Sequence, residues 1–217
     1  SRAGLMTGCY PPRVGITKVL FPRDIIGLNP DETTIAEMLK TKHYSTAAIG
    51  KWHIGHLPKF LPTNHGFDSY FGIPYSNDMD GVKGKNRNLD EAWINRDISP
   101  WNVPLLRNTK EIERPVNQNS ITKRYTQEAQ KFIRNNKSNP FFLYLPHSMP
   151  HIPLFVSDEF YTNNPKEAYI RTIEEIDHSV GQILKTLKET GVDNNTLVIF
   201  TSDNGPWHLK LRHHGGS

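Results

Sequence analysis

Three short apolar runs, each followed by a polar loop, constrain this chain more than any other feature. The runs are YSTAAIG at 44–50, FFLYL at 141–145 and TLVIFTS at 196–202, and none alternates between apolar and polar residues. Strands without this alternation are typical of parallel sheets that are covered on both faces. The chain therefore predicts an α/β fold, with a mainly parallel central sheet flanked by helices on both faces.

Helical periodicity separates these runs. Apolar residues recur every three or four positions in segments 31–42, 120–135 and 166–190. Thr34 and Glu37 form a capping box at the start of the first segment. Its expected buried face consists of Ile35, Met38 and Leu39. We expect helices in all three segments.

Residues 77–117 interrupt this pattern. They are rich in Asn, Asp, Gly and Arg, and Trp93 and Trp101 are their few large apolar residues. We expect a long irregular loop or insertion here, of the kind that often carries specificity.

The composition restricts the class of partner. The chain has 217 residues with 36% apolar content, enough for a sizeable core, and no window approaches the roughly 18 apolar residues of a membrane span. Its 26 Lys and Arg outnumber its 22 Asp and Glu, but no basic run marks a nucleic-acid surface. A small anionic substrate fits this charge better.

Polar loops follow the predicted strands: GKWHIGH, PHSMPH and SDNGP. Ligands of parallel sheets bind beyond the carboxyl ends of the strands. Asp203 and Asn204 offer oxygen ligands there, which suit calcium or magnesium better than zinc, although the same residues also form ordinary turns.

Histidine pairs and a lysine occur in the other two loops. The pairs His53 with His56 and His147 with His151 have spacings that zinc ligands can show. A zinc site would need a further carboxylate or thiolate nearby, and loop histidines that only form hydrogen bonds are the alternative. Lys51, two residues before His53, leaves a predicted strand where an anion would bind.

Taken together, these motifs resemble the sulfatase family. HYSTAAIGKWHIGH resembles its second signature, and the opening SRAGLMTG resembles the first signature, CxPSRxxLxTG, from its Ser onward. GIPYSNDM, PHSMPHIP and SDNGP complete the order of the arylsulfatase A-like branch. The resemblance implies the alkaline phosphatase-like fold and cleavage of sulfate monoesters.

The resemblance also implies groups beyond this chain. In the family, a Cys converted to formylglycine is the nucleophile, three residues before the position of Ser1, and an Asp pair and a second Lys complete the site. We therefore expect residues 1–217 to be part of a sulfatase catalytic domain, truncated at both ends and inactive alone. Cys9 follows Thr-Gly, so we expect it to pack rather than to react.

Roles for individual side chains follow from the same resemblance. Arg2 orients the formylglycine hydrate, Lys51 binds sulfate oxygens, and His53 forms a hydrogen bond with the nucleophile. His151 and Ser76 contact the sulfate and the leaving group, with His151 as the proton donor.

Asp203 and Asn204 contribute to a calcium site in this resemblance, with magnesium as the alternative. The implied partners are a sulfate ester, such as a sulfated glycan or an aryl sulfate, and a formylglycine-generating enzyme. Family members are exported proteins, found in the periplasm, outside the cell or in lysosomes.

Two other functions stay open. The first is a phosphonate or phosphate monoester hydrolase of the same superfamily, although the GIPYSND stretch favours a sulfatase. The second is a non-catalytic binder of sulfated glycans. The residue three places before Ser1 would decide the second case, because only a Cys or Ser there permits conversion to formylglycine.

Overall fold

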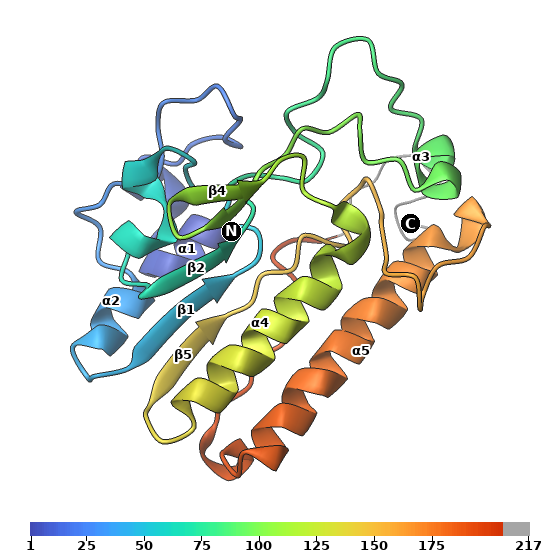
Figure 1. The fold of residues 1–217 in the computed structure, drawn as a ribbon. Coiled ribbons are helices and arrows are strands. Elements are labelled where there is room, and N and C mark those ends of the chain that lie inside the picture. Colours follow the sequence, from blue (N-terminus) through green and yellow to red (C-terminus); the bar gives the residue numbers. More distant parts are fainter. Residues whose placement is uncertain (206–217) are drawn as a thin grey trace.

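Strand β1 (Ser45–Ile49) lies at the centre of the parallel part of the sheet in the computed structural model. It pairs in parallel with β2 (Ser69–Gly72) and with β5 (Phe141–Tyr144). Strands β3 (Leu105–Arg107) and β4 (Lys110–Glu113) extend the sheet beyond β2 through antiparallel pairing, in the order β4-β3-β2-β1-β5 (Figure 1). The expected α/β class is confirmed, with a mixed sheet.

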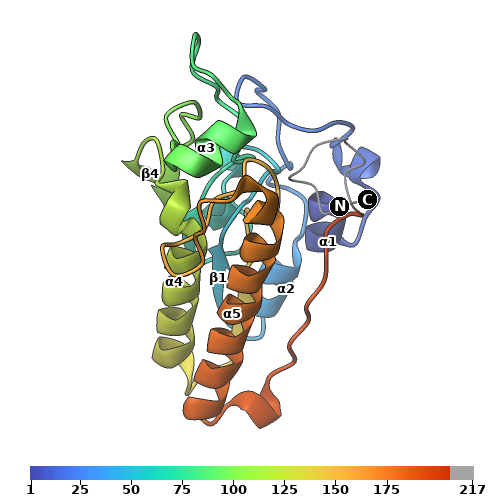
Figure 2. The same cartoon turned by 90° about the vertical axis from the view of Figure 1, so that its right-hand side faces the viewer.

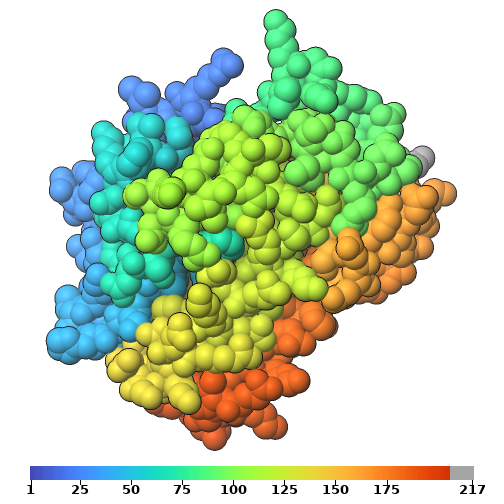
Figure 3. Space-filling model, viewed as in Figure 1, coloured from blue at the N-terminus to red at the C-terminus, as the bar shows by residue number. Residues whose placement is uncertain are grey.

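Helices lie on both faces of this sheet. The structure describes residues 1–205, and its α-helices are α1 (Arg2–Thr7), α2 (Ile35–Lys40), α3 (Leu89–Asn95), α4 (Ile121–Asn136) and α5 (Ala168–Glu189). Helices α4 and α5 pack together on one face, and α1 and α2 lie on the other (Figure 2). Side chains of α4 and its neighbours cover the sheet in space-filling view (Figure 3). No helix among residues 1–205 is long and apolar enough to cross a membrane.

Successive residues of β1 belong to two different cores. Ala47 and Ile49 pack in the cluster that contains Tyr125 of α4. Ala48, between them, packs in the cluster that contains Met6 of α1. Because both faces of the strand are buried, its sequence has no alternation of apolar and polar residues.

Helix α2 forms with its capping box, but it buries a different face from the one expected. The Thr34 hydroxyl accepts from the Glu37 amide, and the Glu37 carboxylate accepts from the Thr34 amide. Met38 is 62% exposed, whereas Ala36 is fully buried. The helix backbone at Ala36 and Glu37 approaches Gly66 so closely that a Cβ on Gly66 would overlap it. This close approach requires glycine at position 66.

The apolar run at 196–202 is not a buried strand in the structure. Leu197, Ile199 and Phe200 are 85%, 76% and 74% exposed. The run extends from the end of α5 back toward α1 (Figure 2), and no strand among residues 1–205 pairs with it. An apolar sequence favours burial, but a strand is buried only where a neighbouring strand and covering side chains are present.

The segment 77–117 is ordered around its tryptophans rather than irregular throughout. It contains α3, β3 and β4, and both Trp93 and Trp101 are buried. The Trp93 indole donates a hydrogen bond to the Thr162 carbonyl oxygen at 2.8 Å. Pairing of β3 with β2 makes the second half of this segment part of the sheet.

Two glycines allow the backbone to crowd together where β1 and β2 end. A Cβ on Gly72 would overlap the carbonyl group of Gly50, and a Cβ on Gly50 would overlap the carbonyl oxygen of Pro146. Gly50 also has φ of 132°, a conformation that other residues rarely adopt. The three strand ends therefore meet only because neither position carries a side chain.

We expect Gly72→Ala to lower the free energy of unfolding by about 3 kcal/mol, because the added methyl group meets backbone that cannot move aside. Gly181→Ala is the matched control. Gly181 lies in α5 with open space around it, so the same change should raise stability by about 0.5–1 kcal/mol through helix propensity. Urea unfolding followed by circular dichroism measures both. Equal effects of the two substitutions would contradict the close approach at Gly72.

Candidate functional site

The loops after β1, β2 and β5 continue to contact one another beyond the strands. The Lys51 amide donates to the Pro146 carbonyl oxygen at 2.8 Å, and the Trp52 amide donates to the Ile73 carbonyl oxygen at 3.0 Å. Because the three strands are parallel, their carboxyl ends lie at the same edge of the sheet. This edge carries most of the side chains that the sequence predicts for the site.

Lys51 is buried at this edge, with 6% of its surface exposed. Within residues 1–205 its ammonium group makes one hydrogen bond, to the Ser76 hydroxyl at 3.3 Å. Burial and then the nearby Arg2 lower the pKa of Lys51, Asp203 and Asp78 oppose the shift, and the resulting pKa is about 8. An ammonium group has three donors, so Lys51 retains capacity to bind an anion.

Arg2, at the start of α1, joins three segments next to Lys51. Its guanidinium donates to the Lys51 carbonyl oxygen at 2.6 Å and to the Tyr144 hydroxyl at 3.4 Å. It also forms an ion pair with Asp203 at 3.2 Å. The structure therefore brings Arg2, Lys51, Ser76 and Asp203 together, although they are far apart in sequence.

His53 has a neutral ring whose Nδ1 has no hydrogen-bond partner among residues 1–205. Its Nε2 lies 3.0 Å from the Leu20 carbonyl oxygen, which can only accept, so Nε2 carries the hydrogen. Burial and then Lys51 lower the pKa of His53 to about 4. The residue has φ of 63°, a strained conformation that costs about 1–3 kcal/mol and is often found at functional sites.

His151 has the opposite arrangement of its ring nitrogens. Its Nδ1 lies 2.7 Å from the Ile152 carbonyl oxygen, so Nδ1 carries the hydrogen and Nε2 is the acceptor. The Asp78 carboxylate lies 3.8 Å from Nδ1. Burial and then Lys51 lower the pKa of His151, and Asp78 opposes the shift. Sequence reasoning did not select Asp78, although it follows Ser76 by two residues in the GIPYSNDM stretch.

Asp203 and Asn204, the predicted metal ligands, make contacts with other groups of the protein. Asp203 is paired with Arg2, and the Asn204 side-chain amide donates to the Gly205 carbonyl oxygen at 2.7 Å. Among residues 1–205, no group of three or more His, Cys, Asp or Glu could hold a metal ion. The side-chain oxygens of Asp203 and Asn204 match the chemistry of calcium, but two residues are too few for an ion that takes six to eight ligands. These residues alone therefore do not form a calcium site.

The histidine pairs do not form a zinc site within residues 1–205. The ring of His56 lies 5.9 Å from the ring of Tyr75, whereas His147 is buried beside Tyr125 and Ser179. Cys9 is exposed, so the expectation that it packs in the interior is wrong. It follows Gly8, which ends α1 in a left-handed conformation and turns the chain outward.

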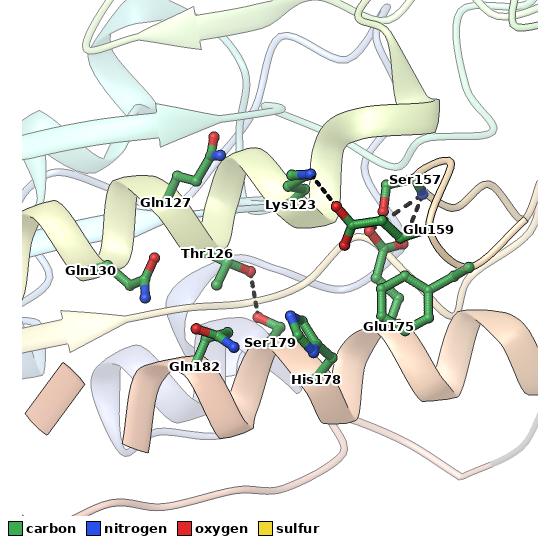
Figure 4. Close-up of a pocket in the computed structure, with 11 residues that line it drawn as sticks. Lys123, Thr126, Gln127, Gln130, Ser157, Glu159, Glu175, His178, Ser179 and Gln182 are labelled. Carbon is green, nitrogen blue, oxygen red and sulfur yellow. Dashed lines mark hydrogen bonds and ion pairs between the residues drawn. The ribbon is translucent and has the colours of Figure 1, made fainter. Parts of the chain in front are cut away.

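A pocket of about 260 Å³ lies between α4 and α5, and no candidate site residue lines it. Its side chains come from the two helices and from the loop that carries Ser157 and Glu159, and they point toward one another (Figure 4). They also pair with one another: Thr126 with Ser179 at 2.6 Å, and Lys123 with Glu159 at 2.7 Å. These contacts explain the pocket as a polar contact region between α4, α5 and the loop before α5, rather than as a reaction site.

The fold and these contacts define an α/β protein with a buried cationic site at the carboxyl edge of its sheet. The family model described as Sulfatase matches residues 1–217. Arylsulfatase G of Rattus norvegicus is 37% identical over 97% of this chain and 42% of its own length. N-acetylgalactosamine-6-sulfatase of Homo sapiens is 35% identical over 100% of this chain and 42% of its own length.

A solved structure agrees with these sequences. The PsFucS1 sulfatase from Pseudoalteromonas sp. superimposes with a TM-score of 0.77 at 26% identity, covering 99% of this chain and 46% of that structure. The chain therefore belongs to the sulfatase family, as its motifs indicated. It spans less than half the length of these relatives.

The lowered pKa of Lys51 predicts a rise in stability with pH. Below about pH 8 both the folded and the unfolded chain hold the Lys51 proton, so the full penalty of burying the charge applies. Between that pH and the ordinary lysine pKa, only the unfolded chain holds the Lys51 proton. The free energy of unfolding therefore increases as the pH rises through this range. We expect a gain of about 2 kcal/mol between pH 7 and pH 9.5 relative to Lys51→Met.

Urea unfolding of both proteins at the two pH values measures this difference. The buried tyrosines, which begin to ionise in the unfolded chain near pH 9.5, affect both proteins equally and cancel in this difference. An identical pH dependence of the two proteins would show that the Lys51 ammonium is not buried.

Proposed function

We propose that this chain carries a large part of the catalytic centre of a sulfuric ester hydrolase. The observation that supports the proposal best is the buried ammonium of Lys51, which has one neutral hydrogen-bond partner within residues 1–205 and lies beside the Arg2 guanidinium. Lys51 and Arg2 are two cations at the carboxyl edge of the sheet, and Asp203 forms an ion pair with Arg2 only. This excess of positive charge favours an anion as the partner of Lys51.

Lys51 and Ser76 would hold the sulfate group. With a pKa of about 8, Lys51 is mostly charged at pH 7, and a bound anion would keep it charged. Its unused donors would face sulfate oxygens, with the Ser76 hydroxyl as a neighbouring donor. Arg2, whose guanidinium donates to the Lys51 carbonyl oxygen, would orient the formylglycine hydrate.

His53 and His151 carry their hydrogen on different ring nitrogens. Neutral His53 offers Nδ1 as an acceptor, which suits a hydrogen bond from a hydroxyl nucleophile. His151 offers Nε2, and it can donate a proton to a leaving group only after that nitrogen is protonated. A bound sulfate would favour protonation because it places negative charge close to the ring.

The proposal includes two groups that the described residues do not themselves supply. Formylglycine, produced by a maturation enzyme from a Cys before Ser1, would supply the attacking oxygen. Calcium, or magnesium in its place, would withdraw charge from the sulfate, with Asp203 and Asn204 among its ligands. Both groups rest on the family resemblance.

The proposed substrates are sulfated sugars or aryl sulfates. Relatives at 35–37% identity are named arylsulfatase G and N-acetylgalactosamine-6-sulfatase, and these names support this range of substrates. Phosphate monoesters are the alternative, because phosphate and sulfate are both tetrahedral anions.

In an active protein that contains this chain, we expect Lys51→Ala to lower kcat/KM for nitrophenyl sulfate by roughly a hundredfold to a thousandfold. Lys40→Ala is the control. Lys40 is half exposed in an ion pair with Asp68 at 2.8 Å, an interaction worth about 1 kcal/mol of stability or less. Asp68 bonds Thr46 near the start of β1, so this pair lies at the amino ends of the strands, opposite the edge that carries Lys51.

The same assay with nitrophenyl phosphate separates the two hydrolase functions. Faster turnover of the phosphate ester would overturn the assignment to sulfate. Equal activity and equal stability of the Lys51 and Lys40 variants would overturn the role of Lys51.

We expect residues 1–217 to bind calcium weakly, with a Kd of about a millimolar or higher, because Asp203 and Asn204 supply too few oxygens. Isothermal titration calorimetry measures this, and Asp203→Asn should weaken the binding further. Tight binding of zinc instead, lost in His147→Gln or His151→Gln, would contradict the proposed chemistry.

A further inference from the structure

Asn77 lies between two residues of the site but faces away from them. Ser76 contacts Lys51, and the Asp78 carboxylate lies near His151. The Asn77 side chain is instead buried in the protein, with 1% of the residue exposed. It therefore has a role other than contact with a substrate.

The Asn77 amide joins the loop after β2 to the loop after β5. Its Nδ2 lies 3.1 Å from the carbonyl oxygens of both His151 and Pro153. Carbonyl oxygens can only accept, so the amide nitrogen, not the amide oxygen, must face them. An amide donor is consequently required at this position.

Gln118, in the turn before α4, completes the connection. Its Oε1 accepts from Asn77 Nδ2 at 3.3 Å, and its Nε2 donates to the Asn77 carbonyl oxygen at 3.0 Å. Gln118 is also 1% exposed. Loss of the Asn77 side chain would leave Gln118 Oε1 without this donor, and loss of the Gln118 side chain would leave the Asn77 carbonyl oxygen without its donor. Each unsatisfied buried group costs about 1–3 kcal/mol.

The carbonyl groups held by Asn77 lie on either side of Ile152. The Ile152 carbonyl oxygen accepts the hydrogen of His151 Nδ1 at 2.7 Å. This bond selects the tautomer of His151 in which Nδ1 carries the hydrogen and Nε2 is the acceptor nitrogen. Any displacement of the Ile152 peptide would release the ring.

We propose that Asn77, supported by Gln118, is a positioning residue that fixes the tautomer and orientation of His151 by holding the backbone on both sides of Ile152. The catalytic importance of this arrangement rests on the proposed function, because it concerns the same His151. The arrangement itself is a property of residues 1–205 and is measurable without turnover.

The test is ¹⁵N NMR of the ring nitrogens in chain 1–217 labelled with ¹⁵N-histidine. The His151 signals are assigned by their loss in His151→Gln. In the unsubstituted chain we expect the widely separated pair of shifts that marks one neutral tautomer. In Asn77→Ala the separation should shrink, and the pKa of His151 should rise toward the ordinary histidine value as water enters.

Asn119→Ala is the matched control. The Asn119 side chain also donates to a carbonyl oxygen, that of Arg96 at 3.0 Å, but this bond lies outside the His151 loop. The control should leave His151 unchanged. Gln118→Ala should cause a smaller change than Asn77→Ala in the same direction.

His147, on the same loop, serves as an internal reporter. A change at His151 alone would support the proposal. An unchanged His151 in Asn77→Ala, or an equal change at His147, would overturn it, because the second result shows general loosening of the loop.

If Asn77→Ala does not fold, Gln118→Glu keeps the volume and removes the Nε2 donor, and an unchanged His151 there overturns the proposal. Loss of the proposed hydrolase activity would leave these spectra unaffected, so the two proposals fail independently.

Discussion

Parallel pairing of β1 with β2 and β5 is the constraint on which the rest of the structure depends. It places three carboxyl strand ends at one edge, and the loops beyond them approach so closely that positions 50 and 72 must be glycine. The same pairing buries both faces of β1, so helices are required on each side of the sheet. Lys51 is buried because it follows the central strand directly, before the chain can return to the surface.

Two residues with ordinarily charged side chains are buried among residues 1–205, and their surroundings differ. The Glu175 carboxylate accepts from the Ser157 backbone amide, and this contact attaches the 153–160 loop to α5. The Lys51 ammonium has the Ser76 hydroxyl as its hydrogen-bond partner and a guanidinium nearby. Burial of a charge is unfavourable unless a partner compensates it. The contact with Ser157 has a structural role for Glu175, whereas the proposed function supplies an anionic ligand as the partner of Lys51.

Much of the candidate site was predictable because its residues lie in contiguous motifs. The order of SRAGLMTG, GKWH, SND, PHSMPH and SDNG indicated the family, and the structure places Arg2, Lys51, Ser76 and Asp203 together. Asp78, Tyr144 and Gln118 were not selected. Their contacts depend on which loops the sheet brings together, and a single sequence contains no direct signal for such contacts.

The sequence by itself determined the α/β class, the central strand, the capping box of α2 and the two long helices, because these depend on local periodicity and local hydrogen bonds. Only the tertiary structure decided that Ala36 rather than Met38 is buried, that β3 joins the sheet, and that the apolar run at 196–200 is exposed within residues 1–205. Burial depends on partners distant in the chain, and an apolar residue is buried only where such a partner covers it. The ring tautomers of His53 and His151 likewise follow from carbonyl groups that the fold brings to them.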